Sequence, residues 1–234
     1  MQTILFDLDG TLLDAGGMGT IGLRRALHVG FGQTMSDQPF DVPFSGRTDR
    51  AILPDILRSV DIEPSQENIG LLRREYSEAI RAFESGEQRV PVRTLPGVDE
   101  LIQQLGHNSA FHLGVLTGNL PESGNAKLRL SGLFSHFKFF FFGDLDADRN
   151  DLASRAKRHL SQRLGKGAGM NLIVVGDAPG DIRCGRHVGA YVIAVCTGRY
   201  QRDELMAHQP DVVLEDLTQT SDIIQIMTRR PECQ

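Results

Sequence analysis

This sequence has few cysteines and no excess of basic over acidic residues, and each shortage excludes a class of protein. The three cysteines (Cys184, Cys196 and Cys233) are widely spaced and odd in number, so they indicate neither a disulfide framework nor a zinc site. The formal net charge is -5. Because proteins that bind nucleic acid need a basic face for the phosphates, no nucleic-acid partner is expected.

Long apolar runs are missing as well. No stretch approaches the roughly 18 apolar residues of a membrane-spanning helix, so no membrane span is expected. The N-terminus lacks a basic region and enters an apolar run at once, which argues against a signal peptide. The composition therefore favours a reduced, cytoplasmic protein. With 234 residues, 40% of them hydrophobic, the chain can form one or two domains.

Short apolar runs recur along the chain and predict buried strands. They are nearly continuous rather than alternating, as expected for strands covered on both faces. The runs are Thr3–Phe6, His112–Leu116, Phe139–Phe142, Leu172–Val175, Tyr191–Val195 and Asp211–Leu214. Helix-like stretches separate most of them. The pattern predicts an α/β fold with a Rossmann-like parallel sheet and helices on both faces.

The interval after the first strand breaks this rhythm. It holds amphipathic helical candidates and no convincing strand. The candidates are Ile21–Val29, Ala51–Val60 and Glu67–Phe83. We therefore predict an α-helical cap domain over residues 15–89, inserted into a catalytic core formed by residues 1–14 and 90–234. The predicted hinges are Ala15–Gly19 and the VPVRTLPG stretch, which are rich in residues that bend the chain.

Polar side chains cluster where the predicted strands end, which is the edge at which open α/β sheets bind ligands. Two acids end the first strand, a Thr-Gly-Asn sequence ends the second, and two more acids follow a later one. These residues are Asp7, Asp9, Thr117, Gly118, Asn119, Asp177 and Asp181. Carboxylates as close as Asp7 and Asp9 repel each other, so their pairing favours a site that also holds a cation.

Three motifs in this set resemble the haloacid dehalogenase superfamily of phosphotransferases. They are DLDGT at Asp7–Thr11, LTGN at Leu116–Asn119 and GDAPGD at Gly176–Asp181. The inserted helical stretch resembles members whose cap follows the first motif, and the resemblance covers essentially the whole chain. It implies a phosphoglycolate phosphatase-like enzyme. Such an enzyme hydrolyses a small phosphorylated metabolite with Mg²⁺, through an aspartyl-phosphate.

The resemblance assigns different roles to the first two aspartates. Asp7 is implied to be the nucleophile, which as a carboxylate is already ionised at neutral pH and needs no base. Asp9 is implied to protonate the leaving oxygen and then to take a proton from the hydrolytic water. Mg²⁺ is implied to be held by Asp7, Asp177 and the backbone carbonyl of Asp9. Asp181 is either a further ligand or a neighbour of the ligands.

The phosphate needs donors and a cation. The resemblance implies that Thr117, Asn119 and the backbone around Gly118 bind the phosphoryl oxygens. Family members also place a Lys or Arg against both nucleophile and phosphate. We favour Lys127, on the helix after LTGN, because an ammonium is a compact charge. Arg149 in DADRND is the alternative, although the Lys-Pro pair that other members carry nearby is missing here.

The segment SGRTDRAIL (Ser45–Leu53) resembles a substrate loop of the cap. Two interpretations stay open: Arg47 contacts an anionic group of the substrate, or the segment serves only to cap the following helix through Thr48 or Asp49. A dehalogenase is disfavoured, because Asp9 would then have no leaving oxygen to protonate. A β-phosphoglucomutase-like phosphotransferase and a non-catalytic phosphate-binding or regulatory module remain alternatives. The sequence does not predict the oligomeric state.

Overall fold

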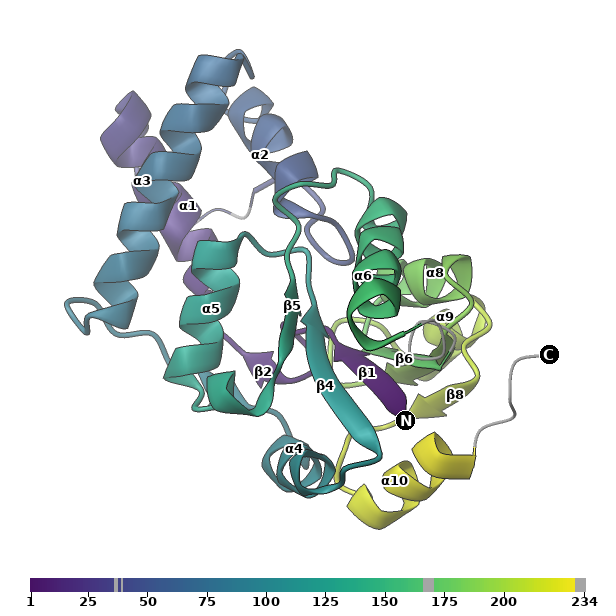
Figure 1. Cartoon of the computed structure of the whole chain (residues 1–234). Helices are drawn as coiled ribbons and strands as arrows, with labels where there is room; N and C mark the ends of the chain where they lie inside the picture. The colour runs from purple at the N-terminus through teal and green to yellow at the C-terminus, as the bar shows by residue number, and fades with distance from the viewer. Residues whose placement is uncertain (36–37, 39, 166–170, 230–234) are drawn as a thin grey trace.

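A six-stranded sheet forms the centre of the computed structural model, which describes residues 1–35, 38, 40–165 and 171–229 (Figure 1). Its strand order is β5-β4-β1-β6-β7-β8, and every neighbouring pair is parallel. The strands are β1 (Gln2–Phe6), β4 (Phe111–Leu116), β5 (Phe139–Phe141), β6 (Leu172–Gly176), β7 (Tyr191–Val195) and β8 (Val212–Leu214). Each predicted strand is confirmed within one residue at either end.

Helices cover both faces of this sheet, as predicted. Ile4 and Phe6 of β1 belong to a core cluster with α4 (Val98–His107) and α10 (Thr220–Arg229). Leu5 belongs to a second cluster with α6 (Arg149–Leu164) and α8 (Pro179–His187). The remaining helices of the core are α5 (Pro121–Leu130), η1 (Phe134–His136) and α9 (Arg202–Met206). Because side chains alternate along a strand, the apolar β1 run fills both layers.

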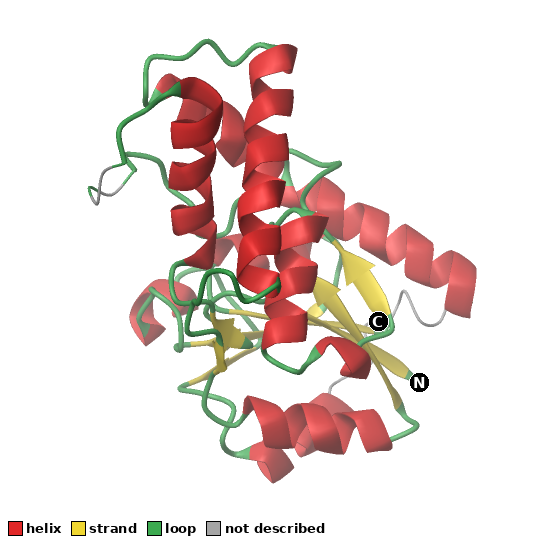
Figure 2. Cartoon of the chain, turned by 90° about the vertical axis from the view of Figure 1, so that its left-hand side faces the viewer, coloured by secondary structure: helices red, strands yellow, loops and turns green. Residues whose placement is uncertain are grey.

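A helical layer follows the first strand. It consists of α1 (Met18–Phe31), α2 (Asp49–Arg58) and α3 (Gln66–Glu84), and no strand lies among the described residues of this stretch. Figures 1 and 2 show the layer beyond one edge of the sheet, with α3 packed between α1 and α5. Ser65 accepts a hydrogen bond from the Asn68 N–H and so caps α3. This arrangement is the inserted helical cap that the sequence predicted.

A short ribbon joins the two connections to this layer. β2 (Leu13–Asp14) and β3 (Arg93–Thr94) pair antiparallel, and Arg93 Nη2 lies 2.8 Å from Asp14 Oδ2. Neither strand was predicted from the sequence, because two residues are too few to show a period. The ribbon places the entry and exit of the helical layer side by side. Hinges at these two segments stay a prediction.

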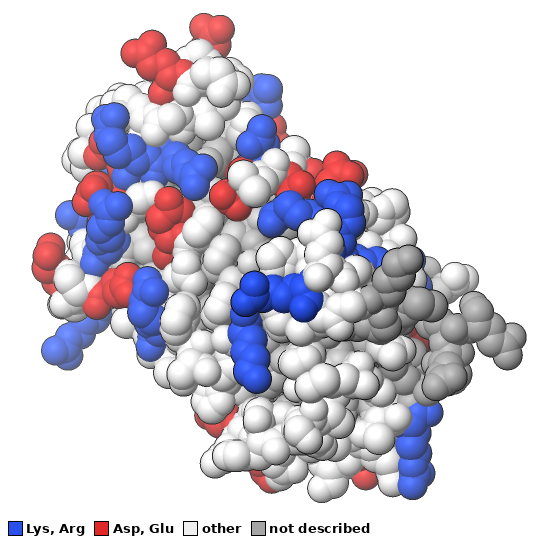
Figure 3. Space-filling view, in the orientation of Figure 1, with Lys and Arg blue, Asp and Glu red and all other residues white. Residues whose placement is uncertain are grey.

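The surface charges, the helices and the cysteines bear on the features that the composition lacks. On the face in Figure 3, basic and acidic side chains alternate over the helical layer and leave no large patch of one sign. No described helix is both long and apolar enough to cross a membrane. Cys184 and Cys196 are free thiols, and Cys233 lies outside the described residues.

Gly97, which precedes α4, is predicted to tolerate no side chain. Its φ is 81°, and a Cβ there would lie 2.1 Å from the backbone oxygen of Leu217. We expect Gly97→Ala to lower the free energy of unfolding by about 2–5 kcal/mol, from left-handed strain together with overpacking. Gly86→Ala is the control, since Gly86 has a φ of 82° but open space around it. Equal losses in urea unfolding would contradict the prediction.

Candidate active site

The DLDGT segment forms a turn at the carboxyl end of β1. The Asp7 N–H donates to Val175 O at 2.9 Å, which extends the pairing with β6, and Gly10 then reverses the chain with a φ of 83°. The carboxylates of Asp7 and Asp9 enter different surroundings. The Asp7 side chain is 12% exposed, whereas that of Asp9 is 45% exposed. The two neighbouring acids can therefore behave as chemically distinct groups.

Asp7 belongs to a buried acidic cluster. Carboxylate oxygens of Asp7, Asp177 and Asp181 lie within 4.8 Å of one another. Asp177 follows β6 and Asp181 lies in the first turn of α8. Arg149, the first residue of α6, places its Nη2 2.8 Å from Asp7 Oδ1 and 2.5 Å from Asp181 Oδ1. Segments distant in sequence thus supply three acids and one guanidinium to the same edge of the sheet.

Burial and mutual repulsion disturb the titration of this cluster. Burial raises the pKa of Asp177 well above its ordinary value, and the nearby charges of Asp181 and Asp7 raise it further. Burial also raises the pKa of Asp181 to about 7, against the opposing effect of Arg149. The ionised cluster therefore needs more positive charge than Arg149 supplies.

The cluster fits a divalent cation. Three carboxylates face one guanidinium, so full ionisation leaves two uncompensated negative charges. The two oxygens of Asp181 are engaged, one by Arg149 and the other by the Ala178 N–H at 3.0 Å. Within the described chain, no hydrogen bond reaches Oδ2 of Asp7 or of Asp177. A hard-oxygen site of this kind suits Mg²⁺, with Asp7 and Asp177 as ligands and Asp181 holding Arg149.

Glycines keep the space around Asp177 open. A Cβ at Gly10 would lie 2.6 Å from Asp177 Oδ2, and one at Gly198 would lie 1.8 Å from it. The loop after β7 is fixed here, because Thr197 Oγ1 donates to Gly10 O at 2.6 Å. Only glycine lets both backbones approach the carboxylate so closely. The sequence analysis missed this loop, although its position after a strand at the same sheet edge was an available signal.

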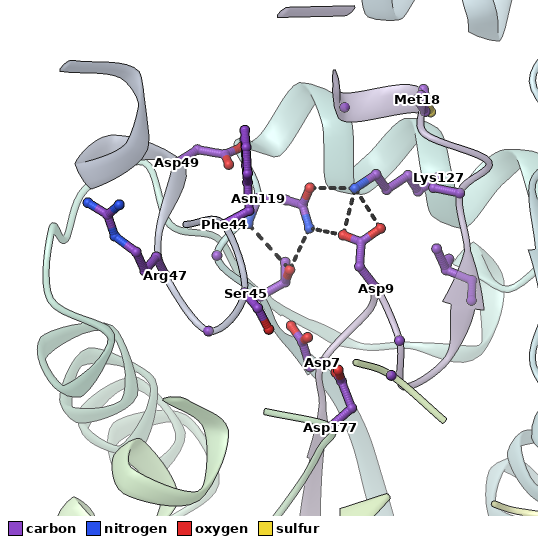
Figure 4. Close-up of a pocket in the computed structure, with 18 of the residues that line it drawn as sticks. Asp7, Asp9, Met18, Phe44, Ser45, Arg47, Asp49, Asn119, Lys127 and Asp177 are labelled. Atoms are coloured by element: carbon purple, nitrogen blue, oxygen red, sulfur yellow. Dashed lines mark hydrogen bonds and ion pairs between the residues drawn. The ribbon is translucent and has the colours of Figure 1, made fainter. Parts of the chain in front are cut away.

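Asp9 is part of a separate network (Figure 4). Lys127 Nζ lies 2.8 and 2.6 Å from the two oxygens of Asp9 and 2.7 Å from Asn119 Oδ1. Asn119 Nδ2 donates to Asp9 Oδ2 and to Thr117 Oγ1, each at 2.8 Å. Gly118 lies between these two residues of the LTGN motif. The structure thus brings Lys127 and the predicted phosphate-binding residues next to the second aspartate.

The two candidate cations are divided between the two aspartates. Lys127, which the sequence analysis favoured as the partner of the nucleophile, contacts Asp9. Arg149, the alternative, contacts Asp7. Both side chains are buried, and both line the same pocket. Their choice of partner depends on how α5 and α6 are oriented against the sheet, which the motif spacing does not reveal.

Arg47 lies close to the site, but its guanidinium points away from the aspartates (Figure 4). It forms an ion pair with Asp55 at 2.6 Å and donates to Pro43 O and Ala51 O. Arg47 and Gly118 both line the pocket. The Arg47 backbone packs closely against Gly118, because a Cβ on Gly118 would lie 1.9 Å from Arg47 O. Contact between Arg47 and a substrate therefore requires this ion pair to open.

The expected cap on α2 was wrong. Thr48 is the N-cap residue of α2, but no side chain caps that helix. Thr48 Oγ1 donates instead to Ala147 O at 2.9 Å, and Asp49 Oδ2 accepts from the Leu120 N–H at 2.7 Å. Both side chains bond across to the core rather than locally. A local capping pattern cannot distinguish these outcomes.

A pocket of about 500 Å³ lies between the sheet edge and the helical layer. Its outer wall is largely apolar and comes from Leu13, Met18, Leu23, Phe44, Ile52 and Tyr76. Arg199, on the loop after β7, also lines it. This exposed side chain has no ion pair with any described residue, and the sequence analysis missed it. The pocket therefore combines charged groups at its base with an apolar wall and a free cation.

We predict that Mg²⁺ stabilises the protein through this cluster. At a hundredfold excess over its dissociation constant, Mg²⁺ should raise the melting temperature by about 5–10 °C in a thermal shift assay. Asp177→Asn should lose most of this shift, because a free carboxylate oxygen is gone. Asp146→Asn is the matched control, since Asp146 pairs with Arg155 outside the pocket. An unchanged shift in Asp177→Asn would refute the assignment.

Without Mg²⁺, the cluster should make stability fall as pH rises. The pKa of Asp181 is about 7 in the folded chain against an ordinary 3.8, so the folded state retains a proton that the unfolded state releases across this window. The free energy of unfolding then decreases with rising pH over the same range. The check is urea unfolding in EDTA at about pH 5 and about pH 8. Asp181→Asn should show a smaller decrease, and an equal decrease would count against the prediction.

Comparison with known proteins agrees with this geometry. Residues 1–189 match the haloacid dehalogenase-like hydrolase family. The chain is 30% identical to the phosphoglycolate phosphatase of Synechococcus elongatus, over 98% of both chains. It is 26% identical to the pyrophosphatase PpaX of Anoxybacillus flavithermus, over 98% of this chain and 99% of that one.

A solved structure shows the same fold. It is a "predicted phosphoglycolate phosphatase" of Haemophilus somnus, with a TM-score of 0.70 and 17% identity, over 95% of this chain and 97% of that one. The family match covers the DLDGT, LTGN and GDAPGD motifs that supply the acids and the phosphate loop. The chain therefore belongs to the haloacid dehalogenase-like hydrolases.

Proposed function

We propose that this hydrolase is a Mg²⁺-dependent phosphatase that acts on a small phosphorylated metabolite through an aspartyl-phosphate on Asp7. The observation that carries the proposal is the separation of two neighbouring acids. Asp7 lies against Arg149 and the acidic cluster, and Asp9 lies against Lys127 and Asn119. A phosphatase of this family needs a nucleophile and a proton carrier side by side. The names of the relatives support the same reaction.

Asp7 is the group that attacks phosphorus. Arg149 Nη2 donates to Oδ1 and orients the carboxylate, which forms a new P–O bond with one of its oxygens. As this P–O bond forms, the bond from phosphorus to the leaving oxygen breaks. Bound Mg²⁺ supplies positive charge that neutralises the phosphoryl oxygens and the acids around them. Thr117 Oγ1 and the backbone N–H groups around Gly118 are placed to donate to the phosphoryl oxygens.

Asp9 is the group that moves the proton. In its protonated form it donates to the leaving oxygen, so that an alcohol departs. As a carboxylate it then removes a proton from the water that attacks the phosphorus of the aspartyl-phosphate. Phosphate leaves and Asp7 is regenerated. Lys127 and Asn119 fix the orientation of Asp9 during both steps.

The pocket favours a substrate with a second anionic group, as in phosphoglycolate or pyrophosphate. Lys127 and Arg149 are committed to the aspartates and Arg47 to Asp55, whereas Arg199 is paired with no described acid. A carboxylate or second phosphate beyond the transferred group would find Arg199 at the exposed side of the pocket. Two relatives are named for phosphoglycolate and for pyrophosphate, each of which carries a second anionic group beside a phosphate.

Loss of the nucleophile should abolish turnover. We expect Asp7→Asn to reduce Mg²⁺-dependent hydrolysis of p-nitrophenyl phosphate at least about 10³-fold, because the amide is a poor nucleophile. Arg149→Gln and Lys127→Met should each cost about 10²–10³-fold in kcat. Lys138→Met is the control, since Lys138 is exposed outside this pocket. Wild-type activity in Asp7→Asn would disprove the mechanism.

A panel of phosphate esters should identify the substrate class. It should include phosphoglycolate, pyrophosphate, nucleotides and glucose 1-phosphate. Sustained phosphate release from glucose 1-phosphate without a mutase product would argue for a phosphatase. No turnover on any ester would favour a binding module.

Arg199 should select for the second anionic group. We expect Arg199→Gln to raise KM about tenfold for phosphoglycolate or pyrophosphate, since a charge-assisted contact is lost. KM for p-nitrophenyl phosphate should stay within about twofold, because that ester has no second anion. Arg158→Gln on the exposed side of α6 serves as the control. Equal changes for all substrates would rule out this role.

A further inference from the structure

Helix α5 carries Lys127, yet its N-terminus has no cap of its own. Its N-cap position is Leu120, which has no side-chain acceptor, and Pro121 follows as the first helical residue. The first N–H groups of a helix need acceptors, and a carboxylate there is also favoured by the helix dipole. Asp49 of α2 supplies that acceptor, with Oδ2 2.7 Å from the Leu120 nitrogen. An acid of the helical layer thus caps a helix of the core.

The neighbours of Asp49 bond to the same part of the core. The Asp49 N–H donates to Gly118 O at 2.7 Å, and the Arg50 N–H donates to Gly143 O at 3.1 Å. Thr48 Oγ1 reaches Ala147 O, two residues before Arg149. Consecutive residues at the start of α2 therefore bind both the loop of the LTGN motif and the loop that leads to Arg149. Asp49 is the member of this group whose side chain holds α5.

The catalytic network is sensitive to the position of α5. Lys127 Nζ contacts both oxygens of Asp9 at 2.6–2.8 Å, and Asn119, just before the helix, contacts the same carboxylate. Misplacement of a catalytic group by about 1 Å can cost about 10²-fold in rate. Removal from water raises the pKa of Asp49 to about 6, so it is ionised at the pH of a standard phosphatase assay. An ionised acceptor makes the stronger hydrogen bond.

We propose that Asp49 is a positioning residue, which aligns Lys127 and Asn119 on Asp9 by capping α5 from the helical layer. Lys127 and Asn119 then hold Asp9 in the orientation for proton transfer only when α2 packs against the core as it does in this structure. This inference rests on the proposed function, because it assigns Asp9 the transfer of a proton to the leaving oxygen. It adds a residue outside all three motifs to the catalytic arrangement.

The leaving group provides a direct test. kcat/KM reports the steps up to release of the alcohol, and an alkoxide needs protonation more than a phenolate does. We expect Asp49→Leu to lower kcat/KM about 100-fold for an alkyl phosphate such as phosphoglycolate, but less than about tenfold for p-nitrophenyl phosphate. Asp49→Asn, which keeps an acceptor oxygen, should restore most of the alkyl phosphate activity.

Two controls separate positioning from general destabilisation. Ser65→Ala removes the cap of α3, a comparable loss within the helical layer, and should leave both kcat/KM values within about twofold of wild type. Amide hydrogen exchange should show faster exchange at Leu120 in Asp49→Leu than in Asp49→Asn or wild type, independently of turnover. Cooperative unfolding of each variant shows that it folds.

Several outcomes would overturn the inference. They are equal losses for both leaving groups in Asp49→Leu, no rescue by Asp49→Asn, or unchanged exchange at Leu120. Absence of turnover in wild type on every phosphate ester is a different result, since it would overturn the proposed function. In that case the exchange of Leu120 alone would decide whether Asp49 caps α5.

Discussion

The repulsion among buried acids at the edge of the sheet is the constraint that organises this molecule. Asp7, Asp177 and Asp181 share one small volume, and Arg149 compensates only part of their charge. Such a cluster costs stability unless a cation completes it. The fold brings the acids together because parallel strands deliver their carboxyl ends to one edge. Gly10 and Gly198 then keep the space that an ion and a phosphate require.

This constraint explains why the second aspartate is kept apart. Asp9 is only two residues from Asp7, but the turn at Gly10 directs its side chain toward α5. There Lys127 and Asn119 donate hydrogen bonds to its carboxylate. An acid that has to exchange protons with a leaving group and with water benefits from partial exposure. A nucleophile benefits from burial beside a fixed guanidinium. One short turn thus puts two neighbouring carboxylates in different surroundings, which suits the different roles that we propose for them.

The sequence predicted the sheet and the acids because both depend on local signals. Apolar runs marked the strands, and the acids directly followed them, so the parallel topology sufficed to bring Asp7 and Asp177 together. The partners of the cations were not predictable in the same way. Lys127 and Arg149 are long side chains on different helices, and which aspartate each one reaches depends on how α5 and α6 pack against the sheet. The partner of Arg47 was not predicted either, because Asp55, which lies further along the chain on α2, forms an ion pair with it.

The same reasoning suggests where substrate choice arises in this family. The base of the pocket is built from motif residues, to which we assign the transferred phosphate, whereas its wall and rim come from Met18, Phe44, Tyr76 and Arg199, which no motif contains. Relatives named for phosphoglycolate and for pyrophosphate align with the whole chain at similar identity. A shared architecture can therefore carry different substrates if only the wall and rim vary. Because residues 48–50 bond α2 to the loops that follow β4 and β5, we expect a change in the helical layer to reach the proposed catalytic residues as well as the wall of the pocket.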